Sequence, residues 1–102
     1  MRSTINVKTK YNSYTYQVYG LNEDWSDVPV NYMFVTSNGK ILYAGQTNSM
    51  KNRMSNHPQL DKAIRLGATK ILARINRDEA SRLIEEKNIV GWFQPTLNTL
   101  LK

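Results

Sequence analysis

The sequence contains no cysteine and a single histidine, His57. The missing thiols exclude disulfide bridges, thiolate zinc sites and cysteine nucleophiles. One histidine likewise excludes metal centres that are built from several imidazoles. A metal ion bound by this chain would therefore depend on carboxylates, water and substrate phosphate, which are the ligands of Mg²⁺ or Mn²⁺.

Long apolar runs are also missing from the sequence. No stretch approaches the ~20 residues needed to cross a bilayer, and the polar segment 1–6 lacks the apolar core of a secretory signal. We therefore expect an intracellular, cytoplasmic protein with no membrane partner. A hydrophobic fraction of 40% with 22% charged residues is typical of a folded chain, and 102 residues suffice for one domain.

The net charge of +6 is unevenly distributed. Residues 1–39 carry as many acidic as basic side chains, whereas in residues 40–77 only Asp61 is acidic and eight side chains are basic. Such a local surplus favours a polyanionic partner such as a nucleic acid, whereas the other interpretation is that small proteins are often basic without one. The side chains expected to contact nucleic acid are Gln46, Lys51, Arg53, Arg65, Lys70 and Arg74.

Residues 1–29 are expected to form an N-terminal extension that packs on the domain formed by residues 30–102. Within the extension, Tyr14, Tyr16 and Val18 alternate with polar residues and predict a short strand. The acidic, turn-like segment that follows contains Trp25, which we expect to anchor the extension by packing.

The domain begins with a predicted hairpin. Two apolar runs, residues 32–35 and 41–44, flank Asn38-Gly39, and in an Asn-Gly hairpin both central residues take a positive φ. Residues 70–75 form a third predicted strand. The expected fold is therefore α/β, of the α+β type, with a small three-stranded, mainly antiparallel sheet flanked by helices.

Three helices are predicted around this sheet. The first begins near Met50 and ends near Pro58, and the second covers residues 59–66 and ends at Gly67. A longer helix covers residues 79–93, because Asn76 or Asp78 can cap its start and Pro95 prevents its continuation. The expected apolar side of this helix comprises Ala80, Leu83, Ile84 and Val90. Trp92 and Phe93 are expected to lie in the core or to cover it.

A set of polar side chains lies at characteristic positions along these elements. Tyr32 and Tyr43 frame the hairpin, eleven positions apart, and Arg53 follows Tyr43 by ten. His57 follows Arg53 by four, which predicts that the two residues lie on adjacent turns of one helical face. Farther along the chain, Glu86 precedes Pro95 by nine positions and Asn98 follows it by three.

With Gly45-Gln46-Thr47 and Gln94-Pro95-Thr96, this pattern resembles the GIY-YIG nuclease superfamily, which includes homing endonucleases and the nuclease of bacterial excision repair. The resemblance covers roughly residues 28–100. The first motif keeps only its tyrosine, because Val30 and Asn31 stand where glycine and isoleucine are usual. In the second motif, Ala44 replaces isoleucine.

The resemblance implies a metal-dependent endonuclease that hydrolyses phosphodiester bonds of double- or single-stranded DNA, with one divalent metal, Mg²⁺ or Mn²⁺. It also implies a DNA-targeting partner protein or a second copy of the chain as possible partners. Tyr32 and Tyr43 correspond to a general base and its hydrogen-bonding companion, in an order that stays open. The remaining implied roles are phosphate stabilisation by Arg53, proton relay or orientation by His57, metal binding by Glu86 and support of the site by Asn98.

The residue types suit this chemistry. A tyrosine has a pKa of about 10 in water, so it becomes a base near neutral pH only where positive charge favours its phenolate. Arg53 is permanently charged and can bind phosphate oxygens while it acts on a tyrosine. A carboxylate such as Glu86 is a hard oxygen ligand of the kind that Mg²⁺ prefers.

Other interpretations of the same residues remain. The two tyrosines can pack across a hairpin without any catalytic role, and a histidine near a helix end is often a surface residue. Glu85 and Glu79 are rivals of Glu86 for the metal. A catalytically inactive nucleic-acid-binding or protein-interaction module of the same fold is the alternative to an enzyme.

Overall fold

The computed structural model describes residues 2–99. Five strands form one sheet: β1 (Thr4–Lys8), β2 (Ser13–Tyr19), β3 (Val30–Thr36), β4 (Ile41–Thr47) and β5 (Ala68–Ile75). The helices are α1 (Met50–Ser55), α2 (Leu60–Arg65), α3 (Glu79–Phe93) and α4 (Thr96–Thr99). The α+β class is therefore confirmed.

All neighbouring strands in the sheet are antiparallel, in the order β1-β2-β5-β3-β4. The prediction of three strands was wrong, because the N-terminal segment adds the hairpin β1–β2 to the free edge of β5. The strand predicted around Tyr16 exists as β2. β1 was not foreseen, although Ile5 and Val7 alternate there with polar residues, and it gains its backbone partners only by pairing with β2. The boundary at residue 29 stays a prediction.

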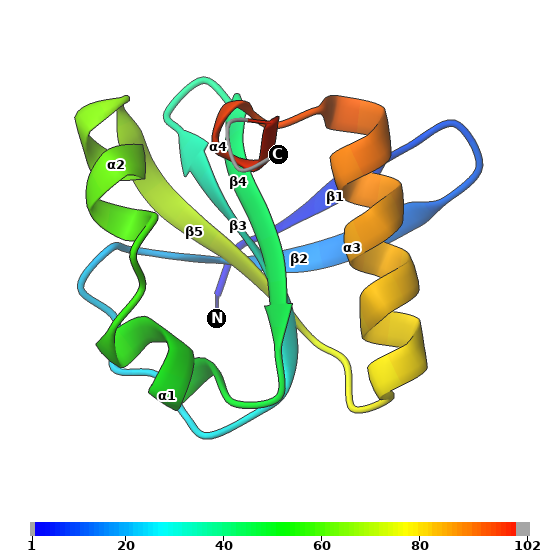
Figure 1. Ribbon diagram of the computed structural model, residues 1–102, viewed down its shortest axis with the longest axis horizontal. Helices are drawn as coiled ribbons and strands as arrows, with labels where there is room; N and C mark the ends of the chain where they lie inside the picture. Colours follow the sequence, from blue (N-terminus) through cyan, green and yellow to red (C-terminus); the bar gives the residue numbers. More distant parts are fainter. Residues whose placement is uncertain (1, 100–102) are drawn as a thin grey trace.

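The helices cover both faces of the sheet. Figure 1 shows α1 and α2 on one side of β4 and α3 on the other, with α4 close to one end of β4. On the α1 and α2 side, Met50, Ala63 and Leu97 pack against residues of β3 and β4, and Trp25 packs against this cluster as expected. On the α3 side, Ile89 packs with Tyr16, Met33 and other buried residues.

The hairpin β3–β4 is present, but its turn differs from the expected one. Gly39 has φ +88°, whereas Asn38 is not among the described residues with positive φ, so only one central residue is left-handed. The register between the strands also shifts after the pair Phe34 and Tyr43, since Val35 pairs with Ile41. Leu42 is thus the extra residue of a β-bulge.

The bounds of α3 agree with the prediction, but the expected buried side was wrong. The residues that α3 buries are Arg82, Glu85 and Ile89, whereas Leu83 and Ile84 are exposed and Val90 is half-buried. Trp92 and Phe93 are exposed as well, contrary to expectation. Arg82 and Glu85 can face the sheet because polar groups of the strands form hydrogen bonds with them. Within residues 2–99, no helix has the length and apolar character needed to cross a membrane.

Candidate active site

The two motif tyrosines lie on the same face of the sheet. Tyr32 pairs with Gly45 and Tyr43 pairs with Phe34 across β3 and β4, so the pleat directs both rings toward α1 and α2. Their ring centroids are 6.1 Å apart. Both tyrosines belong to the buried core cluster on this face, although Tyr43 is the more exposed of the two.

Gly45 allows the Tyr32 side chain to cross β4. A Cβ atom at Gly45 would lie 2.7 Å from the Tyr32 hydroxyl oxygen, 2.8 Å from Cζ of the same ring and 3.0 Å from Cε2 of Tyr43. No other residue type fits there without movement of a buried tyrosine. The glycine of the second motif is therefore required by the position of the first tyrosine.

His57 connects the tyrosines to the helical side of the site. The predicted placement on one helix face with Arg53 was wrong, because α1 ends at Ser55 and His57 lies in the segment before Pro58. His57 is buried rather than a surface residue, and its Nε2 lies 2.6 Å from the Tyr32 hydroxyl oxygen. Its ring also contacts Tyr43 edge-on, with centroids 5.2 Å apart.

The hydrogen bonds of His57 define its tautomer. The backbone N–H of Gln59 donates to Nδ1 at 3.1 Å, so Nδ1 is the acceptor and the proton of the neutral ring is on Nε2. Nε2–H then donates to the Tyr32 oxygen. Burial, followed by the positive charge of Arg53, lowers the pKa of His57 to about 4, which keeps the ring neutral at pH 7.

Arg53 projects from α1 toward both phenols. Its interaction with the Tyr32 hydroxyl is the largest cause that raises the pKa of Arg53, and Tyr43 adds to it. Burial raises the pKa of Tyr32 above its usual range, and the hydrogen bond and charge of Arg53 oppose that rise. Half-buried and positively charged, Arg53 can therefore stabilise either a phenolate or an entering phosphate group.

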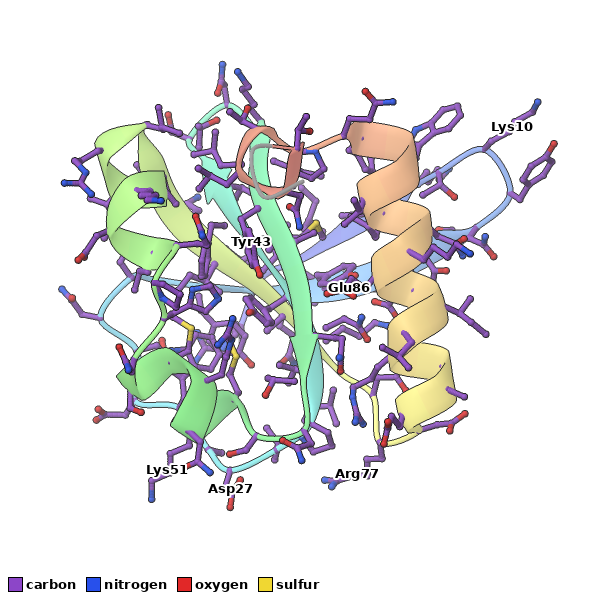
Figure 2. The ribbon with its side chains drawn as sticks, in the orientation of Figure 1. Lys10, Asp27, Tyr43, Lys51, Arg77 and Glu86 are labelled. Carbon is purple, nitrogen blue, oxygen red and sulfur yellow. The ribbon has the colours of Figure 1, made fainter. Side chains whose placement is uncertain are left out.

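Glu86 lies on the opposite side of β4. Figure 2 shows Tyr43 and Glu86 on either side of this strand, which forms the edge of the sheet. Glu86 is half-buried, and burial raises its pKa while a backbone hydrogen bond from Gln46 opposes the rise. Among the described residues, no three or more His, Cys, Asp or Glu side chains gather into a metal-binding group.

The neighbouring glutamates have different surroundings. Glu85 is 1% exposed and accepts hydrogen bonds from the Tyr16 hydroxyl and from Arg74, whose Nη2 lies 2.6 Å from Oε1. Glu79 is exposed at the start of α3. Of the three candidates, Glu86 is the one that is half-buried against the edge of β4.

Asn98 attaches α4 to the same edge strand. Its Oδ1 accepts from the Ala44 N–H and its Nδ2 donates to the Ala44 carbonyl oxygen, both at 2.8 Å. The side-chain amide thus bonds to β4 as a neighbouring strand would, next to Gly45.

The residues expected to contact nucleic acid are dispersed. Arg53 is in the site, and the Gln46 side chain accepts a hydrogen bond from Arg82 beside it. Lys51 is exposed on α1, next to a hollow that it shares with Glu23 and Asp24. The remaining three are Arg65, exposed at the end of α2; Lys70, exposed at the start of β5; and Arg74, ion-paired with Glu85.

Two contacts of the site were not foreseen from the sequence. Arg82 is buried and donates from Nε to the Gln46 side chain at 3.1 Å and from Nη1 to the Asn76 carbonyl oxygen. Its place four residues before Glu86 on one helix face is a signal that could have indicated it. Phe34, two positions after Tyr32, contacts the His57 ring with centroids 4.9 Å apart.

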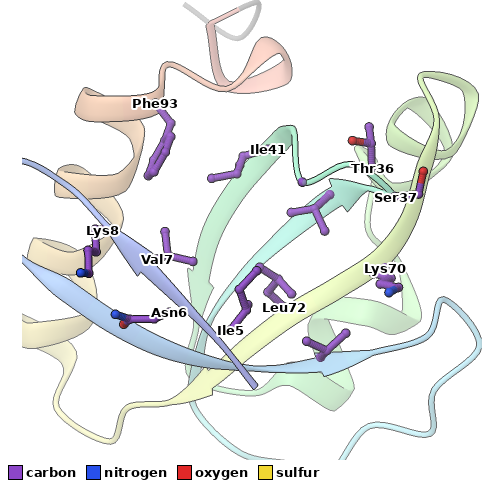
Figure 3. A pocket seen from close by; sticks show the side chains of 13 residues that line it. Ile5, Asn6, Val7, Lys8, Thr36, Ser37, Ile41, Lys70, Leu72 and Phe93 are labelled. Carbon is purple, nitrogen blue, oxygen red and sulfur yellow. The ribbon is translucent and has the colours of Figure 1, made fainter. Parts of the chain in front are cut away.

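A mostly apolar hollow lies away from these groups. It has a volume of about 290 Å³ and is lined by residues such as Ile5, Val18, Ile41 and Phe93 (Figure 3). Its lining includes Lys70 but neither of the two motif tyrosines, nor Arg53, His57, Glu86 or Asn98. The candidate chemistry is therefore located at the edge of β4 rather than in this hollow.

No protein-family model matches the chain. Similar curated proteins are UvrABC system protein C from Psychrobacter cryohalolentis, 30% identical over 83 residues and 74% of this chain, and from Chlamydia trachomatis, 30% identical over 87 residues and 78% of this chain. The chain spans only 13% and 14% of the length of these two relatives.

A similar solved structure is the GIY-YIG N-terminal endonuclease domain of UvrC from Thermotoga maritima, bound to its catalytic divalent cation, magnesium. The TM-score is 0.60 with 24% identity, and the match covers 71% of this chain and 84% of that one. At this identity, the likeness demonstrates a common fold.

Proposed function

We propose that this chain belongs to the GIY-YIG superfamily, which its fold and its sequence relatives support, and that it is an endonuclease that hydrolyses DNA phosphodiester bonds with one divalent metal ion. The observation that carries the proposal is the arrangement around the edge of β4. Tyr32, Tyr43, Arg53 and His57 gather on one side, and Glu86 approaches from the other. A phosphate group placed at this edge would meet a cation, hydroxyl groups and a carboxylate.

The oxygen ligands that the chain offers suit a hard divalent cation. The carboxylate of Glu86 is an oxygen ligand, and a site with one protein carboxylate leaves its other positions to water and substrate phosphate, as Mg²⁺ prefers. When bound, such an ion supplies positive charge that stabilises the pentavalent phosphorus and the leaving oxygen. The magnesium bound by the Thermotoga domain supports this assignment.

The chain's residues would position the substrate and accept a proton. Arg53 would bind non-bridging phosphate oxygens through its planar, permanently charged group. One tyrosine of the pair would take the proton of the attacking water as the new P–O bond forms, and the bond from phosphorus to the 3′-oxygen would break. Arg53 and the Nε2–H of His57 both favour negative charge on the Tyr32 oxygen, which opposes the effect of its burial.

Plasmid and single-stranded DNA, incubated with the protein and Mg²⁺, Mn²⁺ or EDTA, test the proposal. We expect cleavage with either metal and none with EDTA. Glu86→Gln, purified in parallel, controls for a contaminating nuclease and should lose at least about 10²-fold in rate. Retained DNA binding without cleavage under every condition would instead identify an inactive binding module.

A further inference from the structure

A second surface of the molecule combines exposed aromatic rings with positive charge. It is a groove of about 350 Å³ between the turn that joins β1 to β2 and the C-terminal part of α3. Its lining includes Lys10, Tyr11, Lys87, Gly91 and Trp92. We refer to it as the hairpin groove, and Figure 2 shows Lys10 at the hairpin tip beside α3.

The two aromatic residues in the hairpin groove are more exposed than the fold requires. Tyr11 is 82% exposed and Trp92 is 53% exposed, so neither ring contributes much to the core. The turn is closed by the backbone bond from the Thr9 N–H to the Asn12 carbonyl oxygen, which does not involve the Tyr11 side chain. A large aromatic side chain at such a turn has no evident structural purpose.

Gly91 keeps the space beside Trp92 open. A Cβ atom at Gly91 would meet no atom within 4 Å, although a glycine within a helix lowers stability relative to alanine. The helix therefore presents bare backbone at the groove, where a flat ring could approach closely.

The charge of the hairpin groove identifies the kind of ligand. Lys10 and Lys87 line it, and the Lys10 ammonium lies 5.3 Å from the centre of the Tyr11 ring. Among the described residues that line the groove, none is an aspartate or a glutamate. Aromatic faces with flanking lysines suit unpaired bases and their phosphates, because bases stack on aromatic rings and phosphates pair with cations.

We propose that the hairpin groove binds single-stranded DNA, with a base stacked on Tyr11 or Trp92 and adjacent phosphates paired with Lys10 and Lys87. This inference rests on the proposed function in one respect, since it takes the ligand to be a single-stranded part of the DNA substrate. Glu86 and Lys87 are neighbours on α3. One helix thus contributes to both the site at β4 and the hairpin groove.

The test measures binding in EDTA, where cleavage cannot interfere. A labelled oligothymidylate of about 12 nucleotides, within the range of known single-strand site sizes, is titrated with the full chain and followed by fluorescence anisotropy. Tyr11→Ala and Trp92→Ala should each weaken binding by about ten-fold. Leu83→Ala, which removes an exposed apolar side chain from the same helix outside the groove, should have no effect.

A blunt duplex of the same length is the second ligand, because its paired bases offer no free faces for stacking. Its affinity should be unchanged in Tyr11→Ala and Trp92→Ala. Unaltered binding of the oligothymidylate by both variants would overturn the proposal, as would an equal loss for the duplex. Self-association that disappears in Trp92→Ala would also overturn it, since the groove would then hold a second copy. A chain that fails to cleave DNA would contradict the proposed function and leave these binding results intact.

Discussion

At the scale of single residues, His57 is a group whose protonation near neutral pH depends on the fold. Its ring lies among Tyr32, Phe34 and Tyr43, and its Nδ1 accepts a hydrogen bond from the Gln59 backbone. A protonated ring would lose that acceptor and would place positive charge near Arg53. The folded protein therefore favours neutral His57.

The pH dependence of stability tests this environment. His57 has a pKa of about 4 in the folded chain and about 6.5 when unfolded, so the unfolded state binds more protons between these values. The contribution of His57 is fully present above pH 6.5 and is lost as the pH falls toward 4. The loss should reach up to about 3 kcal/mol, since each pKa unit corresponds to about 1.4 kcal/mol.

The measurement is the thermal midpoint of the wild type and of His57→Gln across pH 4 to 7. The wild type should lose more stability than the variant as the pH falls. Parallel curves for the two proteins would show that His57 titrates as it does in water.

Sequence reasoning identified the side chains of the site better than their surroundings. Tyr32, Tyr43, Arg53 and His57 were named from their spacing, and the structure brings them together. The position of His57 outside α1 was not foreseen, because a four-residue spacing indicates a helix face only where the helix continues. The tautomer depends on one backbone N–H, which no residue pattern reveals.

At the scale of elements, the edge strand β4 lies between the tyrosine side and the glutamate side of the site. Gly45 leaves room for the Tyr32 ring, while Asn98 bonds to Ala44 just before it. Gln46, just after it, supplies the backbone hydrogen bond to Glu86. Three consecutive residues of one strand therefore contact the tyrosine side, the C-terminal helix and the glutamate side.

Replacement of Gly45 by alanine should disturb both stability and cleavage. The new methyl group would overlap the buried Tyr32 ring, and overpacking of this kind costs about 1–3 kcal/mol. Movement of that ring would also break its hydrogen bond to His57. Urea denaturation and the plasmid assay measure the two effects.

Gly91→Ala is the matched control for the stability part of this prediction. Gly91 is helical and has open space around it, so alanine should stabilise the chain by about 0.5–1 kcal/mol. If Gly45→Ala were as stable and active as the wild type, the close approach of Tyr32 to β4 would be incorrect.

The limits of α3 could be predicted from local signals, whereas its buried face could not. Asp78 occupies the N-cap position, although its side chain makes no cap hydrogen bond, and the helix ends at the left-handed Gln94 directly before Pro95. Glu85 is buried because Tyr16 and Arg74 supply hydrogen bonds from two other strands. These partners lie far away in the sequence and approach Glu85 only in the assembled sheet. The positions of the apolar residues of α3 therefore predicted the wrong buried face.

At the scale of the whole molecule, the N-terminal hairpin is continuous with the rest of the sheet. β2 pairs with β5, and Val7 and Tyr16 belong to the buried cluster beneath α3. The Tyr16 hydroxyl also donates to the buried carboxylate of Glu85. The hairpin therefore contributes to the core of the molecule and not only to its surface.

A chain that lacks residues 1–19 should not fold stably. Its β5 would become an unprotected sheet edge, and Glu85 would lose a buried hydrogen bond. We expect aggregation or a featureless amide spectrum in nuclear magnetic resonance, compared with the full chain under the same conditions. A dispersed spectrum from the shortened protein would show that residues 20–102 form an independent domain.

The relation between the extension and the rest was the least predictable feature of the fold. The pairing of β2 with β5 joins residues that are far apart in the chain, Gln17 with Ala73 for example. Alternation in the sequence indicates that a strand exists but not which strand it pairs with. The resemblance covered residues 28–100, so it gave no information about the first two strands.

Cleavage of plasmid DNA by Glu86→Gln and Glu85→Gln, compared with the wild type over a range of Mg²⁺ concentrations, tests the central claim most directly. Glu86→Gln should remain folded and lose about 10²–10³-fold in rate. Glu85→Gln should melt at a lower temperature, because it weakens the buried ion pair with Arg74, yet cleave DNA wherever it is folded. Cleavage by Glu86→Gln at the wild-type rate would contradict the assignment of Glu86 to the metal, and with it the proposed mechanism.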